Sequence, residues 1–225
     1  MEIHLDHELE LLKKELTIMC NQSVESLVHA IKALRDQDRD LAQGVIDGDR
    51  EIDMLENKID GMILAVLALQ QPFAIDLRFI ASAMKINNDL ERVADKAVTI
   101  AKGVLHLIGA GYSHEYIAKL LEMGTYSLDM IKRAFTCFIN QDFDTARSVI
   151  KDDKTLDRMN KEAYRNAIEI LSKNTGNADL GLNIYRIAIA FERIGDLAAN
   201  ISEEAIYYMK GRIIKHGSAS GLAHD

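Results

Sequence analysis

Proline is almost absent from this chain: it occurs once in 225 residues, at Pro72. Because proline removes a backbone N–H and clashes with the preceding helical turn, its rarity permits long uninterrupted helices. Hydrophobic residues make up 48% of the chain, in long stretches of Leu, Ile, Ala, Lys and Glu that favour helix. The composition therefore predicts an all-α protein, long enough to bury a full core as one elongated domain or two small ones.

Cysteine occurs only at Cys20 and Cys137, and neither lies in a CxxC pattern. We expect two free, buried thiols in a cytoplasmic protein, not a disulfide framework or a redox centre. No apolar run approaches the ~20 residues of a membrane span. The first residues also lack the pattern of a signal peptide.

Positive charge is scarce, because 27 Lys and Arg face 35 Asp and Glu and leave a net charge of −8. This balance argues against sequence-independent nucleic-acid binding and gives no reason to bind an anionic membrane. The chain also lacks a Gly-rich phosphate loop, a nucleophile elbow, a Ser/His/Asp arrangement and the Glu-x-x-His motif of di-iron bundles. We therefore expect no enzyme, since only a bound metal would supply chemistry.

Paired carboxylates are what the sequence does have. A motif with two acidic residues four positions apart occurs four times, twice in each half of the chain. The copies are Asp49–Asp53, Glu91–Asp95, Asp153–Asp157 and Glu192–Asp196. Residues four apart lie on one face of a helix, so each motif directs two carboxylates the same way.

The motifs are placed symmetrically about two expected turns. Those of the first half centre on position 72, where Gln71-Pro72 breaks a helix. Those of the second half centre on position 174.5, within the turn-forming sequence Asn174-Thr175-Gly176-Asn177. If both are turns of antiparallel helical hairpins, each hairpin brings four carboxylates to one height, and the inner pair of the first half lies roughly 28 Å from its turn. The spacing thus predicts two cages of oxygen ligands.

An internal repeat supports the same plan. Residues 37–53 and 141–157 match at an offset of 104, and the later Glu-Arg motifs match at an offset of 101. Identical pairs include Gln37/Gln141, Asp38/Asp142, Ala42/Ala146, Val45/Val149 and Asp49/Asp153. Each half is therefore expected to fold as three amphipathic helices in an antiparallel bundle.

The expected fold is two pseudo-repeated antiparallel three-helix bundles built from six long helices. In the first half we expect helices at about 5–36, 38–70 and 75–109, with a break at Gly48 between a short segment near 38–47 and a longer one at 49–70. In the second half we expect them at about 113–140, 142–173 and 178–211. The predicted domains are 1–111 and 112–216, followed by a flexible tail at 217–225.

Helical wheels place the acidic motifs on mainly apolar stripes: Glu91 falls beside Ile80 and Met84, and Asp53 beside Leu64. An i,i+4 like-charge pair costs about 0.2–0.5 kcal/mol even on an isolated helix, and burial raises carboxyl pKa values further. A hard multivalent cation removes this conflict. Carboxylate oxygens suit Mg²⁺, Mn²⁺, Ca²⁺ or iron, whereas Zn²⁺ usually recruits His or Cys. Bridging carboxylates also allow clusters of metals.

Other interpretations of these motifs stay open. One acidic pair alone more often lines a solvated helix face, so the metal hypothesis depends on four motifs at mirrored heights. A metal-storing or redox carboxylate bundle and a metal-free helical adaptor are the alternative functions. Arg92 and Arg193 either form structural ion pairs or contact the metal ligands and help to orient them.

Glu56 and Asp60 extend the first acidic stripe, whereas Asn160 and Tyr164 stand at these places in the second half. They are either auxiliary ligands or plain solvated residues.

The run Gln71-Pro72-Phe73-Ala74-Ile75-Asp76-Leu77-Arg78, followed by Asp89-Leu90-Glu91-Arg92-Val93-Ala94-Asp95, resembles the PhoU family of phosphate-signalling regulators. So do Phe191-Glu192-Arg193-Ile194-Gly195-Asp196 and the closing Ala205-Ile206-Tyr207-Tyr208-Met209-Lys210-Gly211. The similarity covers essentially residues 1–217. The second half departs from the Pro-x-x-x-Asp-Leu-Arg pattern, because Asp179-Leu180-Gly181 stands there.

The resemblance implies two pseudo-symmetric three-helix bundles with multinuclear iron or zinc sites, manganese or magnesium being alternatives. The ligands that it implies are Asp49, Asp53, Glu91, Asp95, Asp153, Asp157, Glu192 and Asp196. It also implies negative regulation of the phosphate-starvation response, by contact with the ATPase subunit of a phosphate ABC transporter and with a sensor histidine kinase. We expect a cytoplasmic homodimer, peripheral to the inner membrane through these partners. The partner-binding residues are not indicated.

Overall fold

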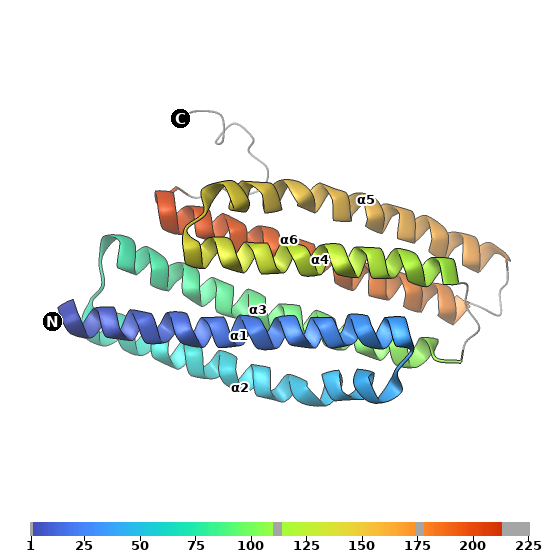
Figure 1. Cartoon of the computed structure of the whole chain (residues 1–225), viewed down its shortest axis with the longest axis horizontal. Coiled ribbons are helices and arrows are strands. Elements are labelled where there is room, and N and C mark those ends of the chain that lie inside the picture. The colour runs from blue at the N-terminus through green and yellow to red at the C-terminus, as the bar shows by residue number, and fades with distance from the viewer. Residues whose placement is uncertain (1, 110–113, 174–177, 213–225) are drawn as a thin grey trace.

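Six long α-helices make up the structure, a computed structural model that describes residues 2–109, 114–173 and 178–212 (Figure 1). The helices are α1 (Glu2–Asp36), α2 (Arg39–Gln70), α3 (Ala74–Leu107), α4 (His114–Asn140), α5 (Phe143–Lys173) and α6 (Ala178–Lys210). No strand occurs in these three ranges. The expected all-α fold of two repeated three-helix units is confirmed, with helix ends within three residues of those expected from the sequence.

The two central helices, α3 and α6, join the halves of the molecule. Helix α3 packs against α1, α2 and α6, while α6 packs against α3, α4 and α5. Figure 1 shows α1–α3 together in one half and α4–α6 in the other. One hydrophobic core runs through both, so the halves are repeats that share a core. The boundary expected at 111/112 and the tail at 217–225 lie outside the described residues.

The connections α1–α2 and α4–α5 are built alike, as the repeat predicts. Each has a glutamine with positive φ, 53° at Gln37 and 55° at Gln141. An aspartate then caps the next helix: Asp38 accepts a hydrogen bond of 2.9 Å from the Leu41 N–H, and Asp142 accepts one of 3.0 Å from the Thr145 N–H. Such N-caps typically contribute about 1 kcal/mol. The sequence repeat is therefore also a repeat of local structure.

Gly48 does not interrupt α2, so the expected break between 38–47 and 49–70 is wrong. A glycine in a helix interior costs about 1 kcal/mol relative to alanine. Val45 and Ile52 on the same helix are buried, and burying such a side chain is worth roughly 1.5–3 kcal/mol. Tertiary packing therefore outweighs the local preference.

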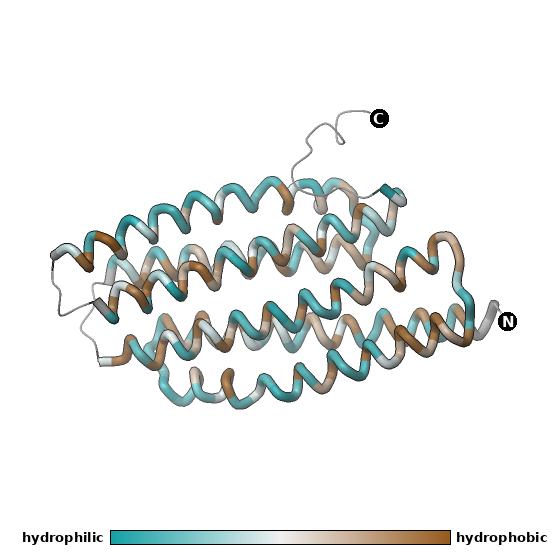
Figure 2. The backbone as a smooth tube through the Cα atoms, turned by 180° about the vertical axis from the view of Figure 1, so that it is seen from behind, coloured by the Kyte–Doolittle hydropathy of each residue, from teal (hydrophilic) through white to brown (hydrophobic). Residues whose placement is uncertain are grey.

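The expected turn at Pro72 is confirmed. Helix α2 ends at Gln70, Gln71 adopts a left-handed conformation with φ 46°, and α3 begins at Ala74. Hydrophobic residues gather in the last turns of α2 beside this connection (Figure 2). Several apolar side chains at this end face solvent: Leu64 is 60% exposed and Leu69 78% on α2, and Phe73, in the connection, is 75% exposed. The second expected turn, at 174–177, lies outside the described residues.

Two further expectations concern the cysteines and the membrane. Cys20 and Cys137 are free and buried, as expected, and burial raises their thiol pKa values to about 12 and about 11. Among the described helices, none combines the length and the apolar character that a membrane crossing needs.

Candidate metal centre

The first acidic cluster lies where α2 and α3 face each other. Its sequence-predicted members are Asp49 and Asp53 on α2, and Glu91 and Asp95 on α3. Burial, together with the negative charges of the other three and of Glu56, raises the pKa of Glu91 to about 7. The pKa of Asp49 is raised by burial, then by Asp53 and by Asp95 across the helix pair. Carboxylates of the two helices therefore lie close enough to act on one another, as the mirrored spacing predicts.

The second cluster repeats the arrangement between α5 and α6. Burial, together with the negative charges of Asp196 and Asp157, raises the pKa of Asp153 to about 6. Burial also raises the pKa of Glu192, as do Asp196, Asp157 and Asp153, whereas Arg193 lowers it. In the second half, too, the charges of the four carboxylates act on one another across the helix pair.

Both clusters lie at the border between core and solvent. Asp53 and Asp95 are exposed, and the other six carboxylates are half-buried. The apolar stripe expected beside Asp53 is not the core-facing one, because Leu64 is exposed while Ile59 and Ile63 supply the buried face of α2. Wheels drawn for single helices cannot separate these two faces, which are only about 100° apart.

The second cluster contains orphaned oxygens. Asp153 Oδ1 and Glu192 Oε2 are buried and have no hydrogen-bond partner within the described part of the chain. Arg193 Nε lies 3.5 Å from Glu192 Oε2, which is an ion pair without hydrogen-bond geometry. A buried acceptor without a partner costs about 1–3 kcal/mol, and more when it is charged. A cation bound between these oxygens removes that cost, so the donor set fits a metal.

The clusters are not preformed coordination shells. Across residues 2–109, 114–173 and 178–212, no three His, Cys, Asp or Glu side chains already converge as metal ligands. The carboxylates are close enough for each to raise the pKa of another. Ligation therefore requires rotation of their side chains, which exposed and half-buried rotamers permit.

The two arginines within the motifs of α3 and α6, Arg92 and Arg193, bind different partners. Arg193 donates to Asp196 over 2.8 Å and lies near Glu192, so its charge offsets the second cluster. The ion pair of Arg92 is with Asp89, at 3.6 Å. Asp89 is only 8% exposed, and burial raises its pKa to about 6. Of the two predicted supporting residues, only Arg193 therefore bonds to a predicted ligand.

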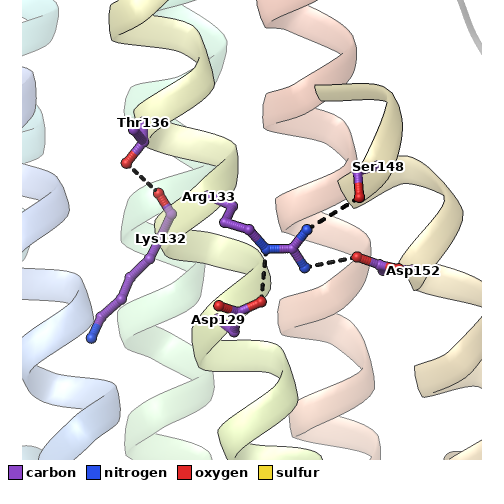
Figure 3. A network of polar contacts seen from close by, with 6 residues as sticks. All are labelled: Asp129, Lys132, Arg133, Thr136, Ser148 and Asp152. Carbon is purple, nitrogen blue, oxygen red and sulfur yellow. Dashed lines mark hydrogen bonds and ion pairs between the residues drawn. The ribbon is translucent and has the colours of Figure 1, made fainter. Parts of the chain in front are cut away.

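A polar network fixes the α5 side of the second cluster (Figure 3). Arg133 on α4 donates to Asp129 and to Asp152, both over 2.7 Å, and more weakly to Ser148 at 3.4 Å. Asp152 precedes Asp153 in the chain. The bond from Arg133 on α4 to Asp152 on α5 therefore helps to fix the rotation of α5 about its axis, and this rotation directs Asp153 toward α6.

Gly195, which no sequence pattern singled out, lets α5 and α6 approach at the second cluster. A Cβ at this position would lie 2.5 Å from Leu156 Cδ1 and 3.5 Å from Asp153 Oδ1. Leu156 is fully buried, so it has little room to move. The available sequence signal was the alanine at the equivalent position, Ala94, since two small residues suggest close helix contact.

Gly195→Ala is expected to be destabilising relative to Gly48→Ala, although both substitutions make the same chemical change. Nothing lies within 4 Å of a Cβ at Gly48, so that variant gains the helix preference of alanine, about 0.5–1 kcal/mol. In Gly195→Ala the overpacking, typically about 1–3 kcal/mol, opposes this gain. Urea unfolding of both variants measures the difference. Equal stability changes would contradict the close approach.

Asn87 is the second residue that the sequence patterns did not indicate. It is fully buried on α3, and its Nδ2 donates over 3.0 Å both to Asp60 Oδ1 and to the Glu56 carbonyl on α2. Its position four residues before Glu91 was the available signal, because this spacing puts both on one helix face.

Known proteins share this architecture and sequence. The PhoU domain model matches residues 16–104 and 120–205, one match in each half. The phosphate-specific transport system accessory protein PhoU homolog of Pseudomonas aeruginosa is 35% identical over 209 residues, covering 93% of this chain and 86% of its own length. PhoU homolog 1 of Thermotoga maritima, described in the same words, is 33% identical over 213 residues, with 95% and 92% covered.

Solved structures agree. The crystal structure of PhoU from Pseudomonas aeruginosa matches with a TM-score of 0.88 at 35% identity, covering 92% of this chain and 99% of that one. The phosphate transport system regulatory protein PhoU from Streptococcus pneumoniae matches with a TM-score of 0.87 at 29% identity, covering 94% and 100%. In sequence, repeat and fold, the chain belongs to the PhoU family.

Proposed function

We propose that this protein is a metal-binding, non-enzymatic regulator of phosphate uptake. The observation that carries the metal part is the meeting of four carboxylates in each half, with pKa values raised by burial and mutual repulsion. Such an arrangement opposes folding unless a cation compensates it. The regulatory part is supported by relatives that are accessory proteins of phosphate-specific transport systems.

Each cluster fits a small group of cations, multinuclear iron or zinc in the first instance, with manganese or magnesium as alternatives. The ligands in this proposal are Asp49, Asp53, Glu91, Asp95, Asp153, Asp157, Glu192 and Asp196. A bound cation supplies positive charge between two helices. The carboxylates then hold α2 to α3 and α5 to α6, while Arg193 keeps Asp196 in place.

The regulator acts by binding other proteins. In this proposal a cytoplasmic homodimer contacts the ATPase subunit of a phosphate ABC transporter and a sensor histidine kinase, and restrains the phosphate-starvation response when phosphate is plentiful. Exposed apolar residues at the α2–α3 end, among them Leu69 and Phe73, support a protein-binding role. Exposed apolar residues that gather on one part of a surface commonly mark interaction sites.

A reporter assay tests the regulatory proposal. In a bacterium that lacks its own PhoU, a starvation-responsive reporter is expected to be active in high phosphate and to be repressed when this chain is produced. Binding of the purified chain to the transporter ATPase and to the cytoplasmic part of the kinase is measured in parallel. Full reporter activity together with absent binding to both partners would contradict the proposal.

Chelation separates the alternative functions. A metal-storing bundle loads iron beyond a few ions per chain, and a metal-free adaptor keeps its stability and partner binding after exhaustive chelation. The proposed regulator loses stability and partner affinity on chelation and regains both when the metal is restored.

A further inference from the structure

A cavity of about 250 Å³ opens between α1 and α2, in the part of both helices nearer to their connection. The buried side chains of Val45 and Ile52 line it on α2. Gly44 and Gly48 line it as well, and nothing lies within 4 Å of a Cβ at either position. Two missing side chains on one face of α2 therefore leave this space open.

The second half fills the same place with the polar network of Figure 3. Helices α1 and α4 both run without interruption to the matching glutamines Gln37 and Gln141, so the offset of 104 pairs positions in the two halves. Four residues that line the cavity have their counterparts in the network: Glu25 for Asp129, His29 for Arg133, Gly44 for Ser148 and Gly48 for Asp152.

The network shows what this place in the fold can hold. The guanidinium of Arg133 on α4 donates to Asp129 and to Asp152, both over 2.7 Å, and to Ser148 over 3.4 Å (Figure 3). One guanidinium thus bridges the two helices, which a planar group with five N–H donors does well.

The first half keeps an acceptor of this network and lacks the donor. Glu25 stands where Asp129 accepts, whereas none of the described residues that line the cavity is Lys or Arg. Glu51 on α2 adds a second carboxylate to the lining. Residues 25 and 51 have their midpoint at 38, in the connection, so the two carboxylates lie at the same distance along the paired helices. The cavity is therefore complementary to a positive charge.

A guanidinium suits the cavity better than a metal ion does. Within residues 2–109, 114–173 and 178–212, no three His, Cys, Asp or Glu side chains converge as metal ligands, here as elsewhere. Gln22, which also lines the cavity, has a buried Oε1 without a hydrogen-bond partner among the described residues. A group with several donors can serve such an acceptor together with the carboxylates.

We propose that the cavity between α1 and α2 binds an arginine side chain of a partner protein, in the place that Arg133 takes within the second half. Glu25 and Glu51 bind the guanidinium, and Gly44 and Gly48 leave room for it. The proposal rests on the protein-binding role proposed above and adds one contact to it.

Nα-acetyl-argininamide serves as the probe in a titration followed by NMR of glycine-labelled protein. The amide signals of Gly44 and Gly48 are expected to shift and saturate, whereas those of Gly181 and Gly195 on α6 stay in place. Nα-acetyl-lysinamide, which has the same charge but no planar fork, is expected to shift Gly44 and Gly48 less. No shift with the arginine probe, or equal shifts with both probes, would overturn the proposal.

The variant Glu25→Gln/Glu51→Gln is expected to lose this response while keeping its fold, because both side chains are exposed. The matched control Glu122→Gln/Glu162→Gln removes two exposed charges from α4 and α5 and is expected to respond like the wild type. His29→Arg supplies a guanidinium from the chain itself, at the position equivalent to Arg133, and is expected to exclude the probe. A wild-type response in Glu25→Gln/Glu51→Gln or in His29→Arg contradicts the assigned site.

The partner-binding assay described above completes the test. Glu25→Gln/Glu51→Gln is expected to bind at least one partner about tenfold to a hundredfold more weakly than the wild type and the matched control do, the usual effect of losing charge-assisted hydrogen bonds. Unchanged binding to both partners overturns the proposed contact and leaves the proposed function standing. If the wild type binds neither partner, the proposed function fails, and the contact with a partner's arginine fails with it even where the probe binds.

Discussion

Replacing Glu91, Asp95, Glu192 and Asp196 with alanine is expected to remove the specifically bound metal while keeping the six helices. The four changes delete two carboxylates from each cluster, so neither retains enough oxygen ligands for a multivalent cation. Alanine is the best helix former, and these four side chains lie at the border of the core, so the helices persist. Elemental analysis of natively purified protein and circular dichroism measure the two effects.

The thermal stability of the quadruple variant gives a second test, because the expected difference from the wild type changes sign when metal is added. Without metal, the quadruple variant is expected to be more stable than the wild type, because the repulsion within each cluster is gone. With metal added, the order reverses, since a ligand that binds only the folded state stabilises it by mass action. Thermal unfolding with and without chelator shows the crossing.

A matched variant controls for the loss of four negative charges. Glu25, Glu51, Glu122 and Glu162 are exposed and lie outside the clusters, so their replacement by alanine is expected to leave the metal content unchanged. Two results count against the clusters as metal sites: far less than one metal ion per wild-type chain, or equal metal content in the wild type and the cluster variant.

The metal-free protein is expected to lose stability as the pH rises from about 4 to about 7. The pKa of Glu91 is raised to about 7 and that of Asp153 to about 6, from ordinary values of 4.5 and 3.8. A folded-state pKa above the unfolded value means that the folded chain binds more protons in this range, so its free energy of unfolding falls with rising pH. A tenfold change in proton affinity between the two states corresponds to about 1.4 kcal/mol, and the partial exposure of both groups reduces the expected total to about 2 kcal/mol.

The effect of Glu91 and Asp153 is measured as the difference in pH dependence between wild type and variant, because other titrating groups stabilise the fold as the pH rises. Asp142, for example, has a lowered pKa from the hydrogen bonds of Thr145, and its contribution is lost as the pH falls. Chemical unfolding at several pH values is therefore measured for the wild type and for Glu91→Gln/Asp153→Asn, which flattens the fall. Glu162→Gln, an exposed carboxylate on α5, is the control and keeps the wild-type slope. A wild-type slope shared by the cluster variant contradicts the proposed repulsion.

Much of this protein follows from its sequence by local rules. One proline and the turn-forming residues mark the hairpins, and a repeat at offsets of 104 and 101 predicts two equal units. The meeting of Asp49 with Asp95 follows from counting residues, because a helix is rigid and rises by a fixed length per residue. Distance along a helix is thus set by the chain alone.

Tertiary structure decides what depends on helix rotation and on the distance between helices. Gly48 stays helical because buried neighbours on α2 outweigh its local cost. Arg193 bonds to Asp196 while Arg92 bonds to Asp89, although both arginines occupy the same place in the motif. Neither the bond from Asn87 to Asp60 nor the close approach at Gly195 can be counted along the chain. The sequence by itself determined which carboxylates lie at the same distance along paired helices. The packing of α3 and α6 against their neighbours decided which of these carboxylates are buried, paired or left without a partner. This could not be read from the sequence, because these contacts join residues on different helices.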